Sequence, residues 1–194
     1  MFETIGRLFI VGALGVLGAC GAGAGLAESG TQSPPEPQNN IEVTSPASQL
    51  KVRATIAAGT LGDTCGQSSF CQRSNVQLAF NAGEGSKNAV IELVSVTLID
   101  AKTSAVLATL AATTPSVWNG NGYVPWNQQM PPNGDLKASY DLASPDWNTI
   151  EGSSANSRTT SYGRDFKLHV RLRIDGVEVL LESTNLNRQP QAVT

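Results

Sequence analysis

Residues 166–183 read FKLHVRLRIDGVEVLLES, in which apolar and polar residues alternate on both sides of an Asp-Gly pair. Asp175 and Gly176 are typical of a two-residue type I′ turn, because both central positions of that turn require positive φ. Pairing outward from the turn predicts three apolar pairs on one face: Ile174 with Val177, Leu172 with Val179, and Val170 with Leu181. The other face receives two pairs that are, or can become, oppositely charged: Arg173 with Glu178 and His169 with Glu182. One register satisfies both faces, which predicts an antiparallel hairpin.

Similar alternation recurs along most of the chain after residue 48. Clear examples are LKVRATI at 50–56, NVQLAFN at 75–81 and LKASYDL at 136–142. The run AVIELVSVTLI at 89–99 changes phase in its middle, which predicts a β-bulge near Leu93. The segments between these runs are rich in Gly, Pro and Asn, as turns are, and none has a convincing helical period.

This pattern predicts an all-β domain at 49–187, an antiparallel β-sandwich of about seven or eight strands. In the stretch MPPNGDLKASYDL at 130–142, a Pro/Gly turn leads into a strand with Tyr140 near its centre, which resembles the strand starts of immunoglobulin- and fibronectin-type domains. The resemblance implies an Ig-like sandwich, although the Cys–Trp–Cys spacing of true immunoglobulin domains is missing. A closed β-barrel is the alternative architecture.

An uncharged hydrophobic run, LFIVGALGVLGA at 8–19, precedes this domain. A bilayer span needs about 20 apolar residues, so this shorter run is typical of the hydrophobic region of a signal peptide, here expected at 1–19. The run ends in LGAC at 17–20, which resembles the lipobox of bacterial lipoproteins. That resemblance implies cleavage before Cys20, a diacylglycerol on the Cys20 thiol with fatty acids such as palmitate, and acylation of the new amine.

The same resemblance implies a location. Two or three acyl chains hold a protein on a membrane, whereas one chain anchors it only marginally. We therefore expect the chain in the cell envelope, with the membrane as its partner through Cys20. In Gram-negative lipoproteins, Asp after the cysteine often marks retention at the inner membrane; Gly21 stands there instead, so we expect the outer membrane, on its periplasmic or surface face. An ordinary secretory signal with an incidental Cys20 is the alternative.

Residues 20–48 have the composition of a linker. Gly, Ser, Pro, Asn and Gln dominate, there is no aromatic residue, and the charged residues are three glutamates. Such a segment buries too little apolar surface to offset the entropy lost on ordering, so we expect a disordered, flexible tether. At the other end of the chain, residues 188–194 are expected to form a C-terminal tail.

Two further cysteines, Cys65 and Cys71, lie in the stretch DTCGQSSFC at 63–71. An even pair in an exported protein predicts a disulfide, which would contribute about 2 kcal/mol by closing a short loop. Metal binding is the alternative, but zinc takes about four N or S ligands and His169 is the only histidine. We therefore expect neither a metal nor a cofactor.

The stretch VWNGNGYVPW at 117–126 concentrates aromatic and amide side chains. The candidate ligand-binding residues are Trp118, Asn119, Asn121, Tyr123, Trp126 and, further along the chain, Trp147. Aromatic faces beside amides can stack on sugar rings and hydrogen-bond their hydroxyls, and aromatic loop residues are also common in protein interfaces. A glycan or an envelope protein is therefore the expected partner. The alternative is that the aromatics plug one end of the sandwich while Gly and Asn form turns.

No catalytic motif stands out. Neither GxSxG nor HExxH is present, and His169 is expected on the solvent face of its strand, opposite Glu182. The chain is therefore predicted to be a binding or structural module of the envelope and not an enzyme. A formal net charge of −3 with no basic cluster argues against a nucleic-acid partner. The alternative function is a hydrolase that acts on envelope polymer through a carboxylate pair that the sequence does not single out.

Overall fold

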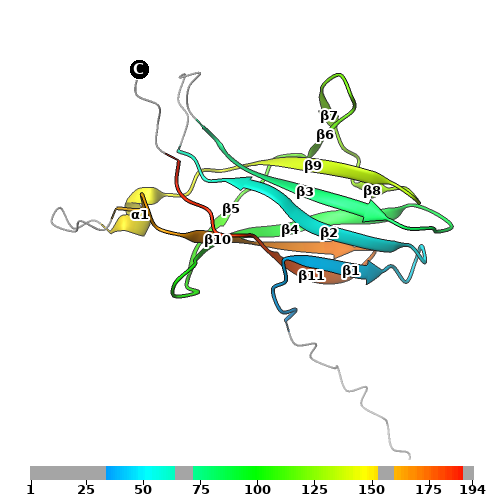
Figure 1. Ribbon diagram of the computed structural model, residues 1–194, viewed down its shortest axis with the longest axis horizontal. Coiled ribbons are helices and arrows are strands. Elements are labelled where there is room, and N and C mark those ends of the chain that lie inside the picture. Colours follow the sequence, from blue (N-terminus) through cyan, green and yellow to red (C-terminus); the bar gives the residue numbers. More distant parts are fainter. Residues whose placement is uncertain (1–33, 64–71, 153–159, 190–194) are drawn as a thin grey trace, which may run out of the picture. The chain divides into compact units, whose positions relative to one another are not determined.

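The computed structural model describes residues 34–63, 72–152 and 160–189. The expected signal peptide, Cys20 and the cysteine pair Cys65 and Cys71 lie outside the described residues. Within them the chain forms eleven strands and one short helix, and the strands assemble into two antiparallel sheets (Figure 1). This confirms the all-β, sandwich-like fold, with eleven strands in the described part instead of seven or eight.

The first sheet has six strands in the order β1-β2-β3-β9-β6-β7. Their bounds are β1 Asn40–Thr44, β2 Lys51–Thr60, β3 Ser74–Ala82, β9 Asp135–Leu142, β6 Ser116–Trp118 and β7 Tyr123–Pro125. The alternation in β3 and β9 sends every second side chain into the core, as predicted. Val76 lies opposite Tyr140 and Leu78 opposite Ala138, and all four side chains are buried.

The second sheet follows the order β11-β10-β4-β5, with β8 paired to the start of β4. The bounds are β11 Val177–Glu182, β10 Phe166–Ile174, β4 Ala89–Asp100, β5 Val106–Leu110 and β8 Gln129–Met130. The β10–β11 hairpin has the predicted register at all five pairs. Asp175 and Gly176 have φ of 44° and 89°, as a type I′ turn requires.

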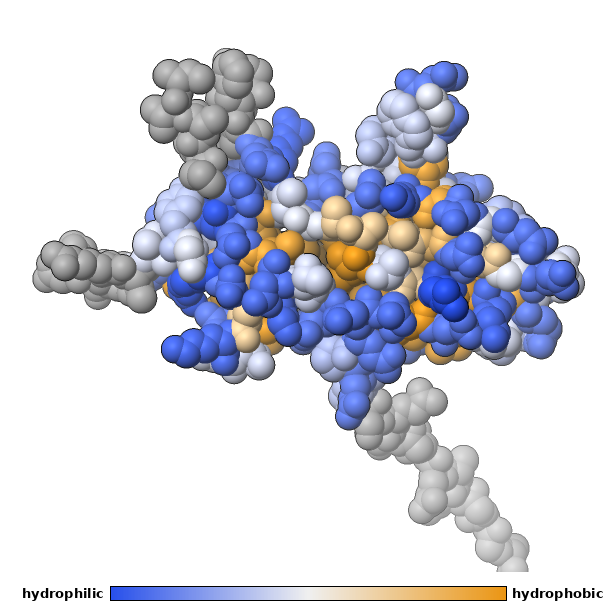
Figure 2. Space-filling model, in the orientation of Figure 1, coloured by the Kyte–Doolittle hydropathy of each residue, from blue (hydrophilic) through white to orange (hydrophobic). Residues whose placement is uncertain are grey.

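The phase change in β4 is a β-bulge, as predicted. Arg171 lies opposite Ser95 and Leu172 opposite Leu93, so Val94 is the extra residue on β4. The apolar residues on both sides of the bulge thereby reach the same core. In that core the buried side chains of the two sheets pack against one another. Figure 2 shows apolar residues along the line between the two layers and polar residues above and below it.

Three features differ from the sequence-based expectation. Strand β1 lies inside the range expected to be a linker, because Ile41 and Val43 pair with β2 over a run too short to stand out from its polar surroundings. The chain also forms a five-residue helix, α1 Trp147–Glu151, whose N-terminus is capped by the Asp146 carboxylate accepting from the Thr149 N–H. Strands β6, β7 and β8 have only two or three residues each, too few for a recognisable alternation.

Among the described residues, no helix has the length and apolar character needed to cross a membrane.

Candidate functional site

The β6–β7 hairpin is the only part of the predicted aromatic stretch that leaves the body of the described domain. Strand β6 pairs with β9 only at Ser116 and Val117, and β7 pairs with β6 alone. From Trp118 onward no described strand flanks the hairpin, so it projects from the sheet (Figures 1 and 2). Short pairing with the sheet therefore creates a free tip whose side chains face solvent.

Two aromatic rings form a pair at this tip. Trp118 lies opposite Tyr123 in the hairpin register, with ring centroids 5.4 Å apart and ring planes at 69°. An edge-to-face pair of this kind is a favourable aromatic geometry. Each side chain is nevertheless 57% exposed. The pair therefore stabilises the hairpin and still offers much of its aromatic surface to solvent.

Asn119 shapes the turn between these rings. Its Oδ1 accepts hydrogen bonds from the backbone N–H groups of Asn121 and Gly122, both at 3.0 Å. The N–H of Asn119 donates to the carbonyl of Gly122 at 3.1 Å, and Gly120 has a φ of 99° that suits glycine. These bonds hold the Asn119 amide in one orientation beside the aromatic pair.

Trp126, although it is close in sequence, belongs to the core. Its side chain is only 7% exposed, and its ring lies 5.5 Å from that of Phe80. The indole N–H donates to the carbonyl of Gln129 at 3.1 Å. Trp126 therefore fulfils the alternative expectation, in which an aromatic residue fills the interior.

Trp147, the remaining candidate, lies in helix α1 and is 5% exposed. Its indole N–H donates to the carbonyl of Gly62 at 3.1 Å, and its ring packs against Phe166. The structure thus brings together four of the six candidates at the hairpin tip, namely Trp118, Asn119, Asn121 and Tyr123. It places Trp126 and Trp147 in the core.

Beside Trp147 the structure contains a charged cluster that the sequence reading missed. Arg188 donates to Asp63 Oδ1 at 2.7 and 3.0 Å and to Glu151 Oε1 at 3.0 Å. Its guanidinium also lies between the rings of Trp147 and Tyr162, at 4.8 and 4.2 Å from their centroids. Arg188 was expected in a C-terminal tail outside the domain, but its side chain is only 12% exposed. No local signal predicts this, because the partners come from distant parts of the chain.

Within this cluster, the acidic and basic groups form hydrogen bonds with one another and with Ser161. Ser161 donates from its hydroxyl and its backbone N–H to Glu151 Oε1. These two bonds, with the nearby Arg188 charge, lower the pKa of the Glu151 carboxyl. The carboxylate is therefore ionised at neutral pH and neutralises the guanidinium. We interpret the cluster as a structural ion-pair network that holds distant segments together, and not as a reactive site.

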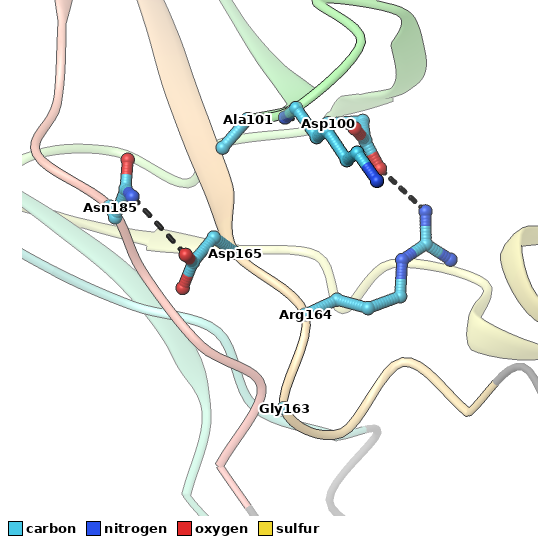
Figure 3. A pocket seen from close by; sticks show the side chains of 7 residues that line it. Asp100, Ala101, Gly163, Arg164, Asp165 and Asn185 are labelled. Carbon is cyan, nitrogen blue, oxygen red and sulfur yellow. Dashed lines mark hydrogen bonds and ion pairs between the residues drawn. The ribbon is translucent and has the colours of Figure 1, made fainter.

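A second charged group lines an open depression of about 430 Å³ between the turn after β4 and the loop before β10 (Figure 3). Arg164 donates to Asp100 Oδ2 at 2.6 Å, and Asn185 donates to Asp165 at 3.3 Å. The Arg164 bond, followed by the Thr103 N–H, lowers the pKa of Asp100 to about 2. Asp100 is thus a permanent anion at neutral pH.

The described carboxyl groups do not favour the hydrolase alternative. A carboxylic acid that protonates a leaving group needs a raised pKa, whereas every shifted carboxyl pKa among the described residues is lowered. His169 lies on the polar face of β10, as expected, and contacts Glu182 at 3.0 Å. Within the described ranges, no cluster of His, Cys, Asp and Glu has the geometry of a metal site.

Comparison with known proteins does not add a function. No protein-family model matches the chain, and the curated proteins include no significant match.

Proposed function

We propose that this chain is a lipid-anchored binding module of a bacterial cell envelope, held on the outer membrane through Cys20. The LGAC sequence at 17–20 and the uncharged run before it support the anchor. Small residues occupy the two positions before Cys20, as cleavage by the lipoprotein peptidase requires. Acyl chains on the thiol and on the new amine then supply the membrane affinity.

The observation that carries the binding function is the pair of exposed rings on the projecting hairpin. A folded domain gains stability by burying Trp and Tyr, yet Trp118 and Tyr123 each keep 57% of their surface exposed. Aromatic residues in such positions are typical of recognition surfaces. The two buried tryptophans show that the same domain has places for large rings in its interior.

The tether sets the distance that such a module could reach from its membrane. Residues 21–33 separate Cys20 from the described chain and can span at most about 45 Å when fully extended. Such a flexible tether would leave the domain free to turn, so the aromatic tip would meet partners within the reach that the tether allows from the anchoring membrane.

The mass of the mature protein, purified from the membrane fraction, tests the anchor. We expect a chain that starts at Cys20 and carries two or three acyl groups, with two hydrogens missing if Cys65 and Cys71 form a disulfide. A mature protein that begins elsewhere or lacks acyl groups would overturn the anchor. Cys20→Ser provides the matched control and should leave the precursor unprocessed.

Site-specific photo-crosslinking in intact cells tests the binding surface. A photo-reactive residue at position 121, on the tip, should yield adducts that disappear when Trp118→Ala is added. The control places the same residue at position 106 of β5, where Val106 is 69% exposed but distant in sequence from the tip. Adducts that are equal at both positions, or that survive Trp118→Ala, would contradict a role for the tip.

A further inference from the structure

The hairpin tip combines two kinds of side chain that suit one class of ligand. Trp118 and Tyr123 offer ring faces, and the Asn119 and Asn121 amides lie on the turn between them. Asn119 uses its Oδ1 within the turn, while no described residue accepts from its Nδ2 group. The side chain of Asn121 is exposed and makes no hydrogen bond to a described residue. Hydrogen-bond donors therefore point outward beside the aromatic surface.

The stretch of chain that includes the tip carries no charge. Residues 103–134, which include β5, the hairpin and β8, contain no Asp, Glu, Lys, Arg or His. A site for an anionic or cationic ligand places opposite charges around it, so this stretch does not suit such a ligand. The tip itself, WNGNGY at 118–123, also lacks the basic residues that attract interfacial segments to anionic lipids.

An uncharged sugar polymer has the complementary chemistry. One face of a pyranose ring presents C–H groups that carry slight positive charge, and these are attracted to the negative face of an aromatic ring. The equatorial hydroxyl and N-acetyl groups of the same sugar accept hydrogen bonds from amide N–H donors. The hydrogen bonds that hold Asn119 reduce the conformational entropy lost on binding.

We propose that the tip residues Trp118, Asn119, Asn121 and Tyr123 bind an uncharged glycan strand. This inference rests on the proposed function and gives it a ligand class. The tip would bind the glycan while the acyl chains on Cys20 hold the membrane, so the protein would connect the two.

Tryptophan fluorescence offers a direct test, because only Trp118 of the three tryptophans is exposed. Full-length mature protein in mild detergent is titrated with chitohexaose and cellohexaose, with polygalacturonate as an anionic probe and phosphatidylcholine vesicles as a lipid probe. We expect a neutral oligosaccharide to shift the emission to shorter wavelength and to protect Trp118 from acrylamide quenching. The anionic polymer and the vesicles should do neither.

Calorimetric titration of variants assigns the binding to the tip. Trp118→Ala and Tyr123→Ala should each weaken affinity for the neutral oligosaccharide at least tenfold. Asn119→Asp keeps the Oδ1 acceptor that forms the turn but removes the Nδ2 donor, so it should also weaken binding. Val106→Ala removes an exposed apolar side chain from the same uncharged stretch and should leave affinity unchanged.

The outcomes separate this inference from the proposed function. Absence of binding to both neutral oligosaccharides would overturn the glycan proposal, as would unchanged affinity in the tip variants or protection by vesicles alone. If adducts from position 121 still form in cells and depend on Trp118, the binding function stands with a different partner. If those adducts are also missing, both proposals fail.

Discussion

At the scale of single residues, Tyr140 has a buried hydroxyl that costs stability. Its side chain is 1% exposed, and the hydroxyl has no partner among the described residues. A buried unpaired donor costs about 1–3 kcal/mol of desolvation, so Tyr140→Phe should leave the free energy of unfolding unchanged or raise it by about 1 kcal/mol. Urea unfolding at pH 7 measures this. A loss of more than about 1 kcal/mol would show that the hydroxyl has a stabilising partner.

Tyr140 also predicts a dependence on alkaline pH. Burial raises the pKa of its phenol above the value of about 10 that it has in the unfolded chain. Below pH 10 the phenol keeps its proton in both states, so the free energy of unfolding does not depend on it. Above pH 10 the free energy of unfolding falls as the pH rises, because only the unfolded state releases the proton. Tyr140→Phe should lack this decline between pH 10 and 11. Unfolding curves of both proteins that remain parallel across this range would contradict the prediction.

Asp175 has a tertiary role in addition to its turn. Its carboxylate accepts from the hydroxyls of Ser45 and Ser48 and, at 2.7 Å, from the N–H of Val90. Burial tends to raise the pKa of this carboxyl, but these hydrogen bonds outweigh that effect and lower it. Asparagine before glycine suits a type I′ turn equally well. Asp175→Asn therefore keeps the turn and changes only the contacts to Ser45, Ser48 and Val90.

We expect Asp175→Asn to reduce the free energy of unfolding by about 1–2 kcal/mol, because its amide nitrogen cannot accept as the second carboxylate oxygen does. Thermal unfolding of the variant measures the loss. A variant as stable as the parent would mean that Asp175 acts only in the turn. Gly176→Ala is the companion variant for the turn, because Gly176 has a φ of 89°.

At the scale of elements, Asp100 joins the β4–β5 turn to the loop before β10. It accepts from the N–H groups of Lys102 and Thr103 on one side and from Arg164 on the other. Its pKa is lowered to about 2, compared with about 3.9 in an unfolded chain. The resulting stability is complete above pH 4 and declines as the pH falls toward 2.

The parent protein should therefore lose about 2 kcal/mol more than Asp100→Asn between pH 5 and pH 2. Urea unfolding at intervals of one pH unit measures the difference. Glu84→Gln is the matched control, because Glu84 is exposed and its side chain makes no hydrogen bond to a described residue. Equal acid sensitivity of the parent and Asp100→Asn would contradict a stabilising role for the ionised carboxylate.

At the scale of the whole molecule, Arg188 connects segments that are far apart in the chain. Asp63 follows β2, Glu151 ends helix α1, and Arg188 itself lies beyond β11. Removal of the guanidinium leaves two carboxylates in a mostly buried site, which is strongly destabilising. Arg188→Ala should reduce the free energy of unfolding by about 3 kcal/mol, measured by urea unfolding.

Arg171 provides the comparison for Arg188. It pairs with Glu178 at 3.4 Å on the exposed face of the sheet, where an ion pair contributes about 1 kcal/mol or less. Arg171→Ala should therefore have a much smaller effect. If both substitutions lower the free energy of unfolding by the same amount, the ion-pair network around Arg188 contributes no more than an exposed ion pair.

Sequence alone determined the features that depend on neighbours in the chain. The Asp-Gly pair requires positive φ at two adjacent positions, and period-two alternation assigns each side chain to one face. The β10–β11 register, the bulge in β4 and the inward face of β9 follow from these local rules. The LGAC resemblance is also local, and it remains the basis of the proposed anchor.

Only the tertiary structure decided which polar and aromatic residues meet. Trp118 and Trp126 are eight positions apart and have the same chemistry, but β6 pairs with β9 over only two residues. The first ring therefore extends into solvent, while the second returns to the core beside Phe80. The contacts of Arg188 with Asp63 and Glu151 have a related cause, because all three residues come from distant segments. Contacts between distant segments depend on how the sheets and loops pack, and a local pattern contains no information about that packing.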